Sequence, residues 1–285
     1  MTDVVTEDHA AQPPLIHRLC PICADPNEGT PTSRYARDDW RLVNCRVCDF
    51  PYLASVPATE RLVEELAWEK TFVEERKARH RRYPLLAWLD ARTRWRLRLF
   101  PRPSETALLK RVAPRGPVID IGCGPGNYLA ELADTFAPLH GVEISREHAA
   151  IAQQRIGEAG TVCHAPAIEG LKSFPDNYFA GALLRSYLEH EWQARDVLDT
   201  LRRKLRREAR VVVKIPNYGS LNRIVMGRAW CGFRFPDHVN YFTRRSLVQL
   251  IEPIGYCASF PSMRNLPTDD NLIAILSLNA CSPRD

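Results

Sequence analysis

The sequence contains no apolar run approaching the roughly 20 residues that a membrane-spanning helix needs. Its mostly apolar runs at 211–215 and 272–278 have the length of strands. Residues 1–12 include three acidic residues and neither lysine nor arginine, which excludes the pattern of a secretory signal or an organelle transit peptide. Internal repeats and low-complexity tracts are also lacking. These absences predict a cytoplasmic protein without a membrane partner.

What is present is the composition of a globular protein. Of the 285 residues, 45% are hydrophobic and 26% are charged, so intrinsic disorder is not expected for most of the chain. This length accommodates one large domain and a small accessory module. The net charge of +5 permits an anionic partner without requiring one.

Nine cysteines, an odd number, occur without an export signal, so a disulfide framework is not expected. Four of them form two CxxC motifs, Cys20-Pro-Ile-Cys23 and Cys45-Arg-Val-Cys48, with 21 residues between the motifs. Four thiolates at this spacing give the closed tetrahedral shell of structural zinc, with no open position for catalysis. Buried or redox-active cysteines are the alternative. We predict a zinc ribbon that depends on its metal for folding.

Changes of pattern divide the chain into four parts. Residues 1–14 are expected to be a disordered tail, 15–58 the zinc-ribbon module, 59–112 a helical linker or lid, and 113–285 a larger domain. In the larger domain, strand-like runs alternate with helical patterns, which predicts βαβ units and a parallel sheet with helices on both faces. The expected strands are 118–121, 139–143, 161–164, 179–184, 211–215, 256–263 and 271–278.

A glycine-rich loop follows the first of these strands. Glycines stand at 122, 124 and 126, after Asp120, and Glu143 ends the second strand. Glycine lets a backbone turn sharply and approach a ligand closely at the start of a helix. Nicotinamide-binding sheets carry GxGxxG at this place, but the third glycine here comes one residue too early for that motif. A carboxylate at the end of the second strand suits both hydroxyls of a ribose.

These residues resemble class I S-adenosylmethionine-dependent methyltransferases over about 102–278. The resemblance implies a Rossmann-like sheet of seven strands whose last strand is antiparallel. It also implies that Asp120, Gly122 and Gly124 line the amino-acid end of the cofactor and that Glu143 holds the ribose. The full set of cofactor-binding residues implied in this way is Asp120, Gly122, Cys123, Gly124, Gly126, Asn127, Glu143 and Ile144. One position departs from the family, because Ala165 or Pro166 stands where an acid often meets adenine.

Two histidines are candidates for a catalytic base. Methyl transfer from a sulfonium is an in-line displacement, and a base is needed only where the acceptor loses a proton. His190 follows the fourth strand in Leu188-Glu189-His190, and a structural role is expected for it. His238, beside Asp237, lies in a segment ending in Phe-Thr that resembles methyltransferases of nucleotide-linked sugars, several of which carry a cysteine zinc module. We predict His238 as base with Asp237 as its partner, against the alternative that His238 only holds a loop.

Substrate contacts are expected after the fifth strand, at the carboxyl edge of the sheet where such folds bind ligands. The candidates are Asn217, Tyr218 and Tyr241. The sequence therefore predicts a methyltransferase acting on a small metabolite, plausible acceptors being a saccharide or a diphosphate-linked intermediate. An RNA methyltransferase using the ribbon and the basic stretch at 76–98 is one alternative, and a non-catalytic scaffold is another. The methylated atom and the oligomeric state stay open.

Overall fold

The computed structural model describes residues 15–57 apart from 38 and 39, residues 104–278 apart from 262–264 and 266, and residues 77, 81–84, 88 and 92. The predicted tail at 1–14, most of the predicted linker and most of the basic stretch at 76–98 lie outside this part of the chain. In the described part, no helix is long and apolar enough to cross a membrane.

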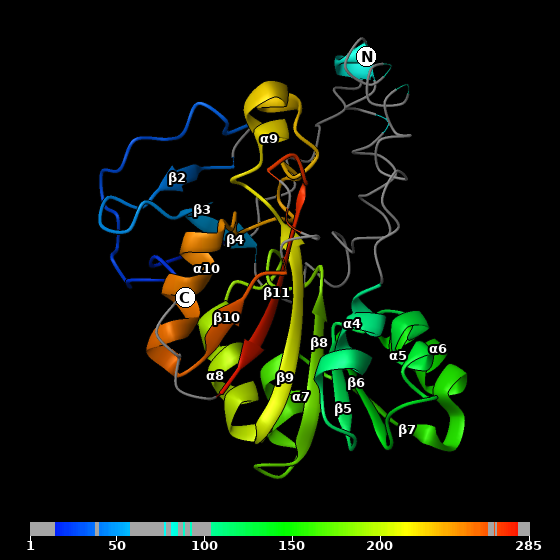
Figure 1. Ribbon diagram of the computed structural model, residues 1–285. Helices are drawn as coiled ribbons and strands as arrows, with labels where there is room; N and C mark the ends of the chain where they lie inside the picture. The colour runs from blue at the N-terminus through cyan, green and yellow to red at the C-terminus, as the bar shows by residue number, and fades with distance from the viewer. Residues whose placement is uncertain are drawn as a thin grey trace, which may run out of the picture.

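A seven-stranded sheet forms the centre of the larger domain (Figure 1). Its strand order is β10-β11-β9-β8-β5-β6-β7. The strands are β5 (Val118–Ile121), β6 (Leu139–Glu143), β7 (Gly160–His164), β8 (Phe179–Arg185), β9 (Leu205–Pro216), β10 (Cys257–Ser259) and β11 (Asn271–Ser277). Strands β5 to β9 pair in parallel, whereas β11 is antiparallel to both of its neighbours. The predicted Rossmann-like sheet with an antiparallel last strand is confirmed.

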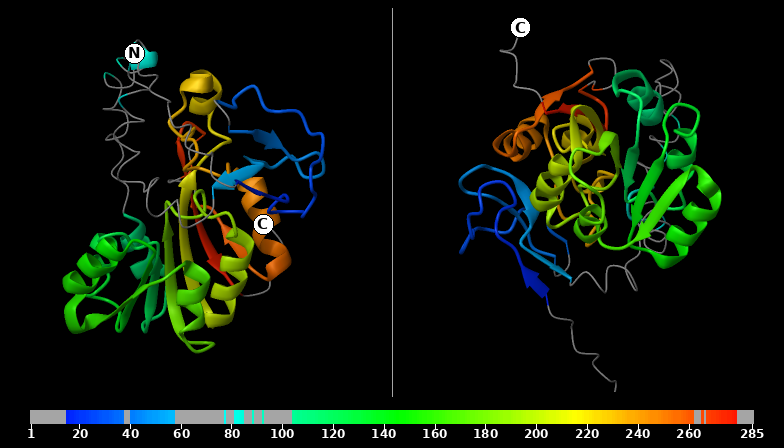
Figure 2. Two further views of the ribbon diagram at one scale, coloured as in Figure 1. Left: turned by 180° about the vertical axis from the view of Figure 1, so that it is seen from behind. Right: turned by 90° about the horizontal axis from the view of Figure 1, so that it is seen from below.

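Helices cover both faces of the sheet (Figure 2). One face carries α4 (Glu105–Val112), α5 (Asn127–Glu131) and α6 (Arg146–Ile156), followed by the 3-10 turn η2 (Gly157–Ala159). The other carries α7 (Ala167–Lys172), α8 (Ala194–Lys204) and α10 (Arg244–Ile251), followed by η4 (Glu252–Ile254). Successive strand residues pack on opposite faces of the sheet. Val118 lies in the core under α4, α5 and α6, and Ile119 in the core under α7, α8 and α10. This burial on both faces explains why the strands read as continuous apolar runs.

Helix α4 packs on the sheet through Leu108 and Leu109, both of which are buried. At its start, Glu105 pairs with Arg185 of β8 at 3.1 Å. The sequence division at 113 places this helix in the linker, but its apolar face belongs to the core of the larger domain. The helix packs there because it is amphipathic, and its apolar side is buried against the sheet that follows it in the chain.

The cysteine-bearing module consists of two small antiparallel sheets. The first pairs β1 (Leu15–His17) with β4 (Ser55–Pro57), and the second pairs β2 (Leu42–Asn44) with β3 (Pro51–Leu53). The module lies beside the upper end of β9 in Figure 1. Its Leu42, Leu53 and Val56 share one buried cluster with aromatic residues from the segment after β9. The module is therefore packed onto the larger domain.

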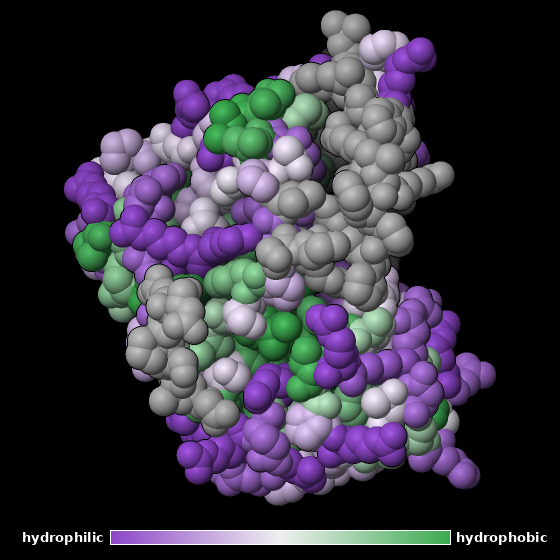
Figure 3. Space-filling view, in the orientation of Figure 1, coloured by the Kyte–Doolittle hydropathy of each residue, from purple (hydrophilic) through white to green (hydrophobic). Residues whose placement is uncertain are grey.

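The segment after β9 contains α9 (Leu221–Met226) and the 3-10 turn η3 (Gly227–Ala229). Figure 3 shows an apolar patch over α9, where Leu221, Ile224 and Val225 are 49%, 60% and 79% exposed. Beyond η3, Trp230 is buried and donates from its indole Nε1 to Asp270 at 2.7 Å. The segment is thus fixed at its base while α9 presents its apolar side outward.

Candidate active site and cysteine cluster

Four parallel strands deliver the predicted site residues to one edge of the sheet. Strand β5 ends in the glycine loop, β6 ends at Glu143, β8 leads into residues 186–191, and β9 leads into the segment that carries His238. Because parallel strands point the same way, their carboxyl ends meet at the edge where doubly wound sheets bind ligands.

The glycine loop adopts a backbone that favours glycine. Gly122, Gly124 and Gly126 have φ values of +70°, +53° and +76°. A Cβ atom on Gly126 would lie 2.9 Å from the Cα of Ala152, so this glycine lets α6 approach. A Cβ on Gly124 would meet no atom within 4 Å. The loop therefore packs against α6 at Gly126, while the space beside Gly124 contains no protein atom within 4 Å of that Cβ position.

Glu143 is buried and fastened to that loop. Its Oε2 accepts from the backbone N–H of Gly124 at 2.8 Å, and its Oε1 accepts from the N–H of Ser145 at 2.9 Å. A carboxylate has about four acceptor positions, so each oxygen keeps one for a ligand hydroxyl. Ser145 also caps α6 by accepting from the N–H of His148. The site's acidic residue is thus positioned by the loop and by the next helix.

Asp120 lies inside the domain, 3% exposed. Burial raises the pKa of its carboxyl to about 8; Arg185 opposes the shift and Glu143 adds to it. At neutral pH the carboxyl therefore keeps its proton unless a cation approaches. A ligand ammonium group beside it would favour the ionised form.

We expect S-adenosylmethionine binding to release a proton from Asp120 at about pH 6.5. The carboxyl is protonated below its pKa of about 8 in the free protein, and a bound ammonium lowers that pKa, so affinity should rise with pH by up to about tenfold per unit between about pH 6 and 7. Calorimetry in two buffers of different ionisation enthalpy measures the proton release. In Asp120→Asn the release should vanish; an unchanged release would contradict the role of Asp120.

The adenine end of the predicted site carries no acid at the usual place. Ala165 donates its backbone N–H to the carbonyl of Glu143 at 3.1 Å, and Pro166 begins α7. Nearby, the ring Nε2 of His164 lies 3.1 Å from the carbonyl oxygen of Ile144. Backbone groups and the ring of His164 lie near this place, and the expectation that backbone groups and apolar side chains hold adenine stays a prediction.

The structure brings together two histidines that the sequence treats separately. The rings of His190 and His238 are 4.7 Å apart and nearly perpendicular. Each has Nδ1 against a backbone carbonyl, His190 with Asp237 at 2.9 Å and His238 with Gly232 at 2.8 Å. A carbonyl oxygen only accepts, so both Nδ1 atoms carry the hydrogen and both Nε2 atoms keep a lone pair.

Charges around this pair are buried. Burial, with help from Arg234, lowers the pKa of His190 to about 4 and that of His238 well below its ordinary value. Burial raises the pKa of Glu189 to about 8. Asp237, the predicted partner of His238, pairs through its carboxylate with Arg234 at 3.4 Å and reaches His190 through its carbonyl. The assignment of His238 and Asp237 as catalytic residues stays a prediction.

The three predicted substrate contacts occupy more enclosed places than the sequence suggests. Tyr218 and Tyr241 are 8% and 2% exposed, with ring centroids 5.9 Å apart in the aromatic cluster below the module. Asn217 uses its amide in a turn, donating to the carbonyl of Asp269 and accepting from the N–H of Gly219. Packing accounts for these residues, and their assignment to substrate binding stays a prediction.

Sequence reasoning misses Arg18, which connects the module to the site. This buried guanidinium donates to the carbonyls of Val239 and Trp192 at 3.1 and 3.0 Å and to Oδ1 of Asn240 at 2.8 Å. Asn240 in turn donates to the carbonyl of Leu188 at 2.8 Å. No sequence motif marks these contacts, because two of the three partners are backbone carbonyls and all three lie more than 170 positions away.

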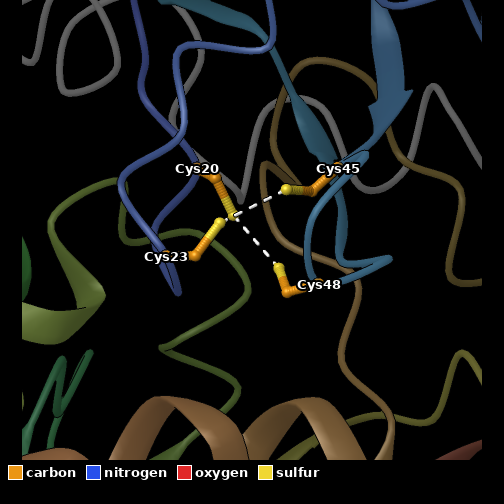
Figure 4. A group of neighbouring side chains, drawn as sticks. All are labelled: Cys20, Cys23, Cys45 and Cys48. Atoms are coloured by element: carbon orange, nitrogen blue, oxygen red, sulfur yellow. Dashed lines mark hydrogen bonds between the residues drawn. The ribbon is translucent and has the colours of Figure 1, made fainter.

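The four cysteines of the CxxC motifs converge from two loops (Figure 4). Their sulfur atoms all lie within 4.8 Å of one another, with Cys20–Cys48 at 3.5 Å and Cys23–Cys45 at 3.4 Å. Four sulfurs bound to zinc at about 2.3 Å would be separated by about 3.8 Å. Asn27 adds an amide donor to the sulfur of Cys45 at 3.4 Å, which favours a thiolate there. The donor set fits a closed tetrahedral metal site.

A family model described as a methyltransferase domain matches residues 78–257. The chain belongs to this methyltransferase family. The predicted S-adenosylmethionine-dependent methyltransferase and its fold are thereby confirmed at the level of the family. A comparison with curated proteins finds no match.

Several solved structures are similar to this chain at low sequence identity. The small RNA methyltransferase HEN1 is 24% identical, with a TM-score of 0.50 over 63% of this chain and 26% of its own. A SAM-dependent methyltransferase from Archaeoglobus fulgidus is 19% identical, with a TM-score of 0.46 over 68% and 99%. The [4+2]-cyclase SpnF is 19% identical, with a TM-score of 0.45 over 54% of this chain and 57% of that protein's length.

The methyltransferase site fits the family's cofactor. Glu143 keeps acceptor positions for ribose hydroxyls, Asp120 provides a carboxyl for an ammonium group, and the space beside Gly124 is open. Each predicted residue of the loop reaches this edge; Cys123 is buried beneath it, and Asn127 begins α5. Tyr187, which the sequence did not single out, packs its ring against Gly122 on one side of the loop. A Cβ atom on Gly122 would lie only 2.7 Å from that ring.

Proposed function

We propose that this methyltransferase methylates an oxygen or carbon atom of a small metabolite, such as a saccharide or a diphosphate-linked intermediate. One observation carries the proposal: the two histidine Nε2 lone pairs lie on the segments after β8 and β9, at the same sheet edge as Glu143 and the glycine loop. A proton acceptor is useful only for an acceptor atom that must lose a proton, such as a hydroxyl or an acidic carbon.

The chain's own residues divide the work of the reaction. Bound S-adenosylmethionine supplies an electrophilic methyl group on a sulfonium. Glu143 holds the ribose, Asp120 orients the amino-acid end, and the neutral His238 accepts the proton at Nε2. One carboxyl oxygen of Glu189 lies within 4.8 Å of a ring nitrogen of each histidine. An imidazolium formed there favours ionisation of this buried carboxyl, and the resulting carboxylate stabilises the imidazolium. Alignment in a buried site provides the rest of the rate acceleration.

We also propose that the cysteine cluster binds structural zinc and that the module forms one wall of the acceptor site. Arg18 supports this role, since it bonds both to the segment of His238 and to the loop after His190. An RNA-binding module would instead keep a surface open for the strand, whereas this one uses part of its core to pack on the aromatic cluster. Zinc therefore affects the reaction only by folding the module that forms this wall.

Transfer of labelled methyl groups tests the proposed acceptor class. The zinc-loaded full chain is incubated with labelled S-adenosylmethionine and with either a mixture of sugar nucleotides or total RNA. We expect label in the small-molecule fraction, and much less with His238→Asn. Salt-sensitive labelling of RNA would contradict the proposal. Cofactor binding with no labelling of either would favour the scaffold alternative.

A further inference from the structure

A second candidate metal site lies apart from the four cysteines. One carboxylate oxygen of Glu189 and one ring nitrogen each of His190 and His238 lie within 4.8 Å of one another. Glu189 and His238 are 1% and 4% exposed, whereas His190 is only partly buried, so the group lies inside the protein with one member reaching toward the surface. Within the described residues, only this group and the cysteines bring three such ligands together.

The Oε2 atom of Glu189 is buried and has no hydrogen-bond partner among the described residues. Buried polar atoms are nearly always satisfied, and a bound water or ion is one explanation for an exception, here favoured by the two imidazoles beside it. The two imidazoles are prepared for the same role. Their Nδ1–H groups bond to the carbonyls of Asp237 and Gly232, which fixes both Nε2 lone pairs as acceptors. A second hydrogen bond of this kind typically orients a metal-binding histidine.

We propose that Glu189, His190 and His238 bind a divalent transition-metal ion. Two neutral imidazoles and one carboxylate form the ligand set of catalytic zinc sites, which keep an open position for an oxygen ligand. Imidazole donors favour zinc, iron, nickel or copper over magnesium and calcium. Its nitrogen and oxygen ligands are harder than the four thiolates of the cysteine cluster, and it leaves a coordination position free where the cysteines leave none.

Neighbouring cations do not occupy this place. Arg234, Lys214 and Arg185 act electrostatically on Glu189. Arg234 pairs with Asp237, while Arg185 and Lys214 both pair with Glu105, at 3.1 and 3.8 Å. Since Oε2 of Glu189 accepts from none of them, it stays available to an ion.

The metal site deepens the proposed function and rests on it for its role in the reaction. A hydroxyl of the acceptor takes the open position, and the ion lowers the pKa of that hydroxyl. Its proton leaves to solvent, its oxygen bonds to the methyl carbon, and the carbon–sulfur bond breaks with its electron pair going to sulfur. In this form His238 is a metal ligand instead of the proton acceptor.

Zinc stoichiometry at equilibrium tests the site. The full chain is dialysed against zinc at a fixed free concentration, and bound zinc is counted by mass spectrometry. We expect two ions per wild-type chain and one per chain in His190→Asn, His238→Asn and Glu189→Gln. Asparagine keeps an amide donor close to the position of Nδ1 and removes Nε2, so the bonds to the backbone carbonyls are retained. His17→Asn, on exposed β1, is the matched control and should keep both ions.

S-adenosylmethionine titration of the same samples separates the two claims. One zinc per wild-type chain, or two in the asparagine variants, overturns the metal site. If cofactor binding persists in that case, the proposed function stands without the metal. Two ions without cofactor binding would leave the metal site and remove the proposed function. Retained cofactor binding in the variants shows that they are folded.

Discussion

Replacing Cys45 by serine is expected to release one zinc ion and unfold residues 15–57. The sulfur of Cys45 is buried in the four-cysteine cluster, and serine cannot supply the thiolate that zinc prefers. Structural zinc contributes on the order of 10 kcal/mol to such small modules, which is as large as the whole stability of many domains. The effect should reach the active site, because Arg18 then loses its hold on Val239 and Trp192.

Zinc content and thermal unfolding together measure this effect. Cys163→Ser is the control, since Cys163 lies on β7 away from the cluster, with its sulfur 3.8 Å from the hydroxyl oxygen of Ser173. The control should keep its zinc and its melting temperature. Full zinc content in Cys45→Ser would contradict the assignment of the cluster.

Gly124→Ala is expected to abolish most of the affinity for S-adenosylmethionine while leaving the protein folded. An added Cβ meets no atom of the protein, so it enters the open space beside the loop, where the cofactor belongs. Overfilling a fitted site costs about 1–3 kcal/mol, or about five- to 150-fold in affinity. Calorimetric titration measures the change.

Gly157→Ala is a matched control for backbone strain. Gly157 has a φ of +54°, compared with +53° for Gly124, and its Cβ would also meet no atom within 4 Å. Both substitutions should lower stability, because each places a Cβ on a backbone with positive φ. Only Gly124→Ala should weaken binding. Equal affinities in the two variants would place the cofactor elsewhere.

The sheet could be predicted from the sequence because its strands are buried on both sides. β5 and β6 match their expected limits at 118–121 and 139–143, since each run is apolar and bounded by turn residues. The short helix α7 was missed, because its six residues do not complete two helical turns of periodicity. Strand β9 begins at Leu205, inside a basic run, because Leu205 pairs with Phe179 across the sheet.

The candidate cofactor residues could be proposed from the sequence because they stand close together in it, around two strand ends, and their assignment stays a prediction. The Glu189–His190–His238 group could not, since nearly 50 residues separate its two halves and only the fold brings them together. The same limit applies to Arg18, whose partners lie far away in the sequence and include the backbone carbonyls of Val239 and Trp192, which carry no signal of residue type. Tyr218 and Tyr241 show another limit, because aromatic residues near a site also pack against one another, and their assignment to substrate binding stays a prediction.

Titration of the zinc-loaded full chain with S-adenosylmethionine, repeated on Glu143→Gln, tests the central claim that this sheet edge holds the cofactor. Glutamine preserves the size of the side chain but replaces one carboxylate oxygen by an amide donor, so it cannot accept from both Gly124 and Ser145 while holding two ribose hydroxyls. We predict micromolar binding by the wild type, weakened by about 1–3 kcal/mol in the variant. No binding by folded wild-type protein, or equal binding by both, would contradict the account.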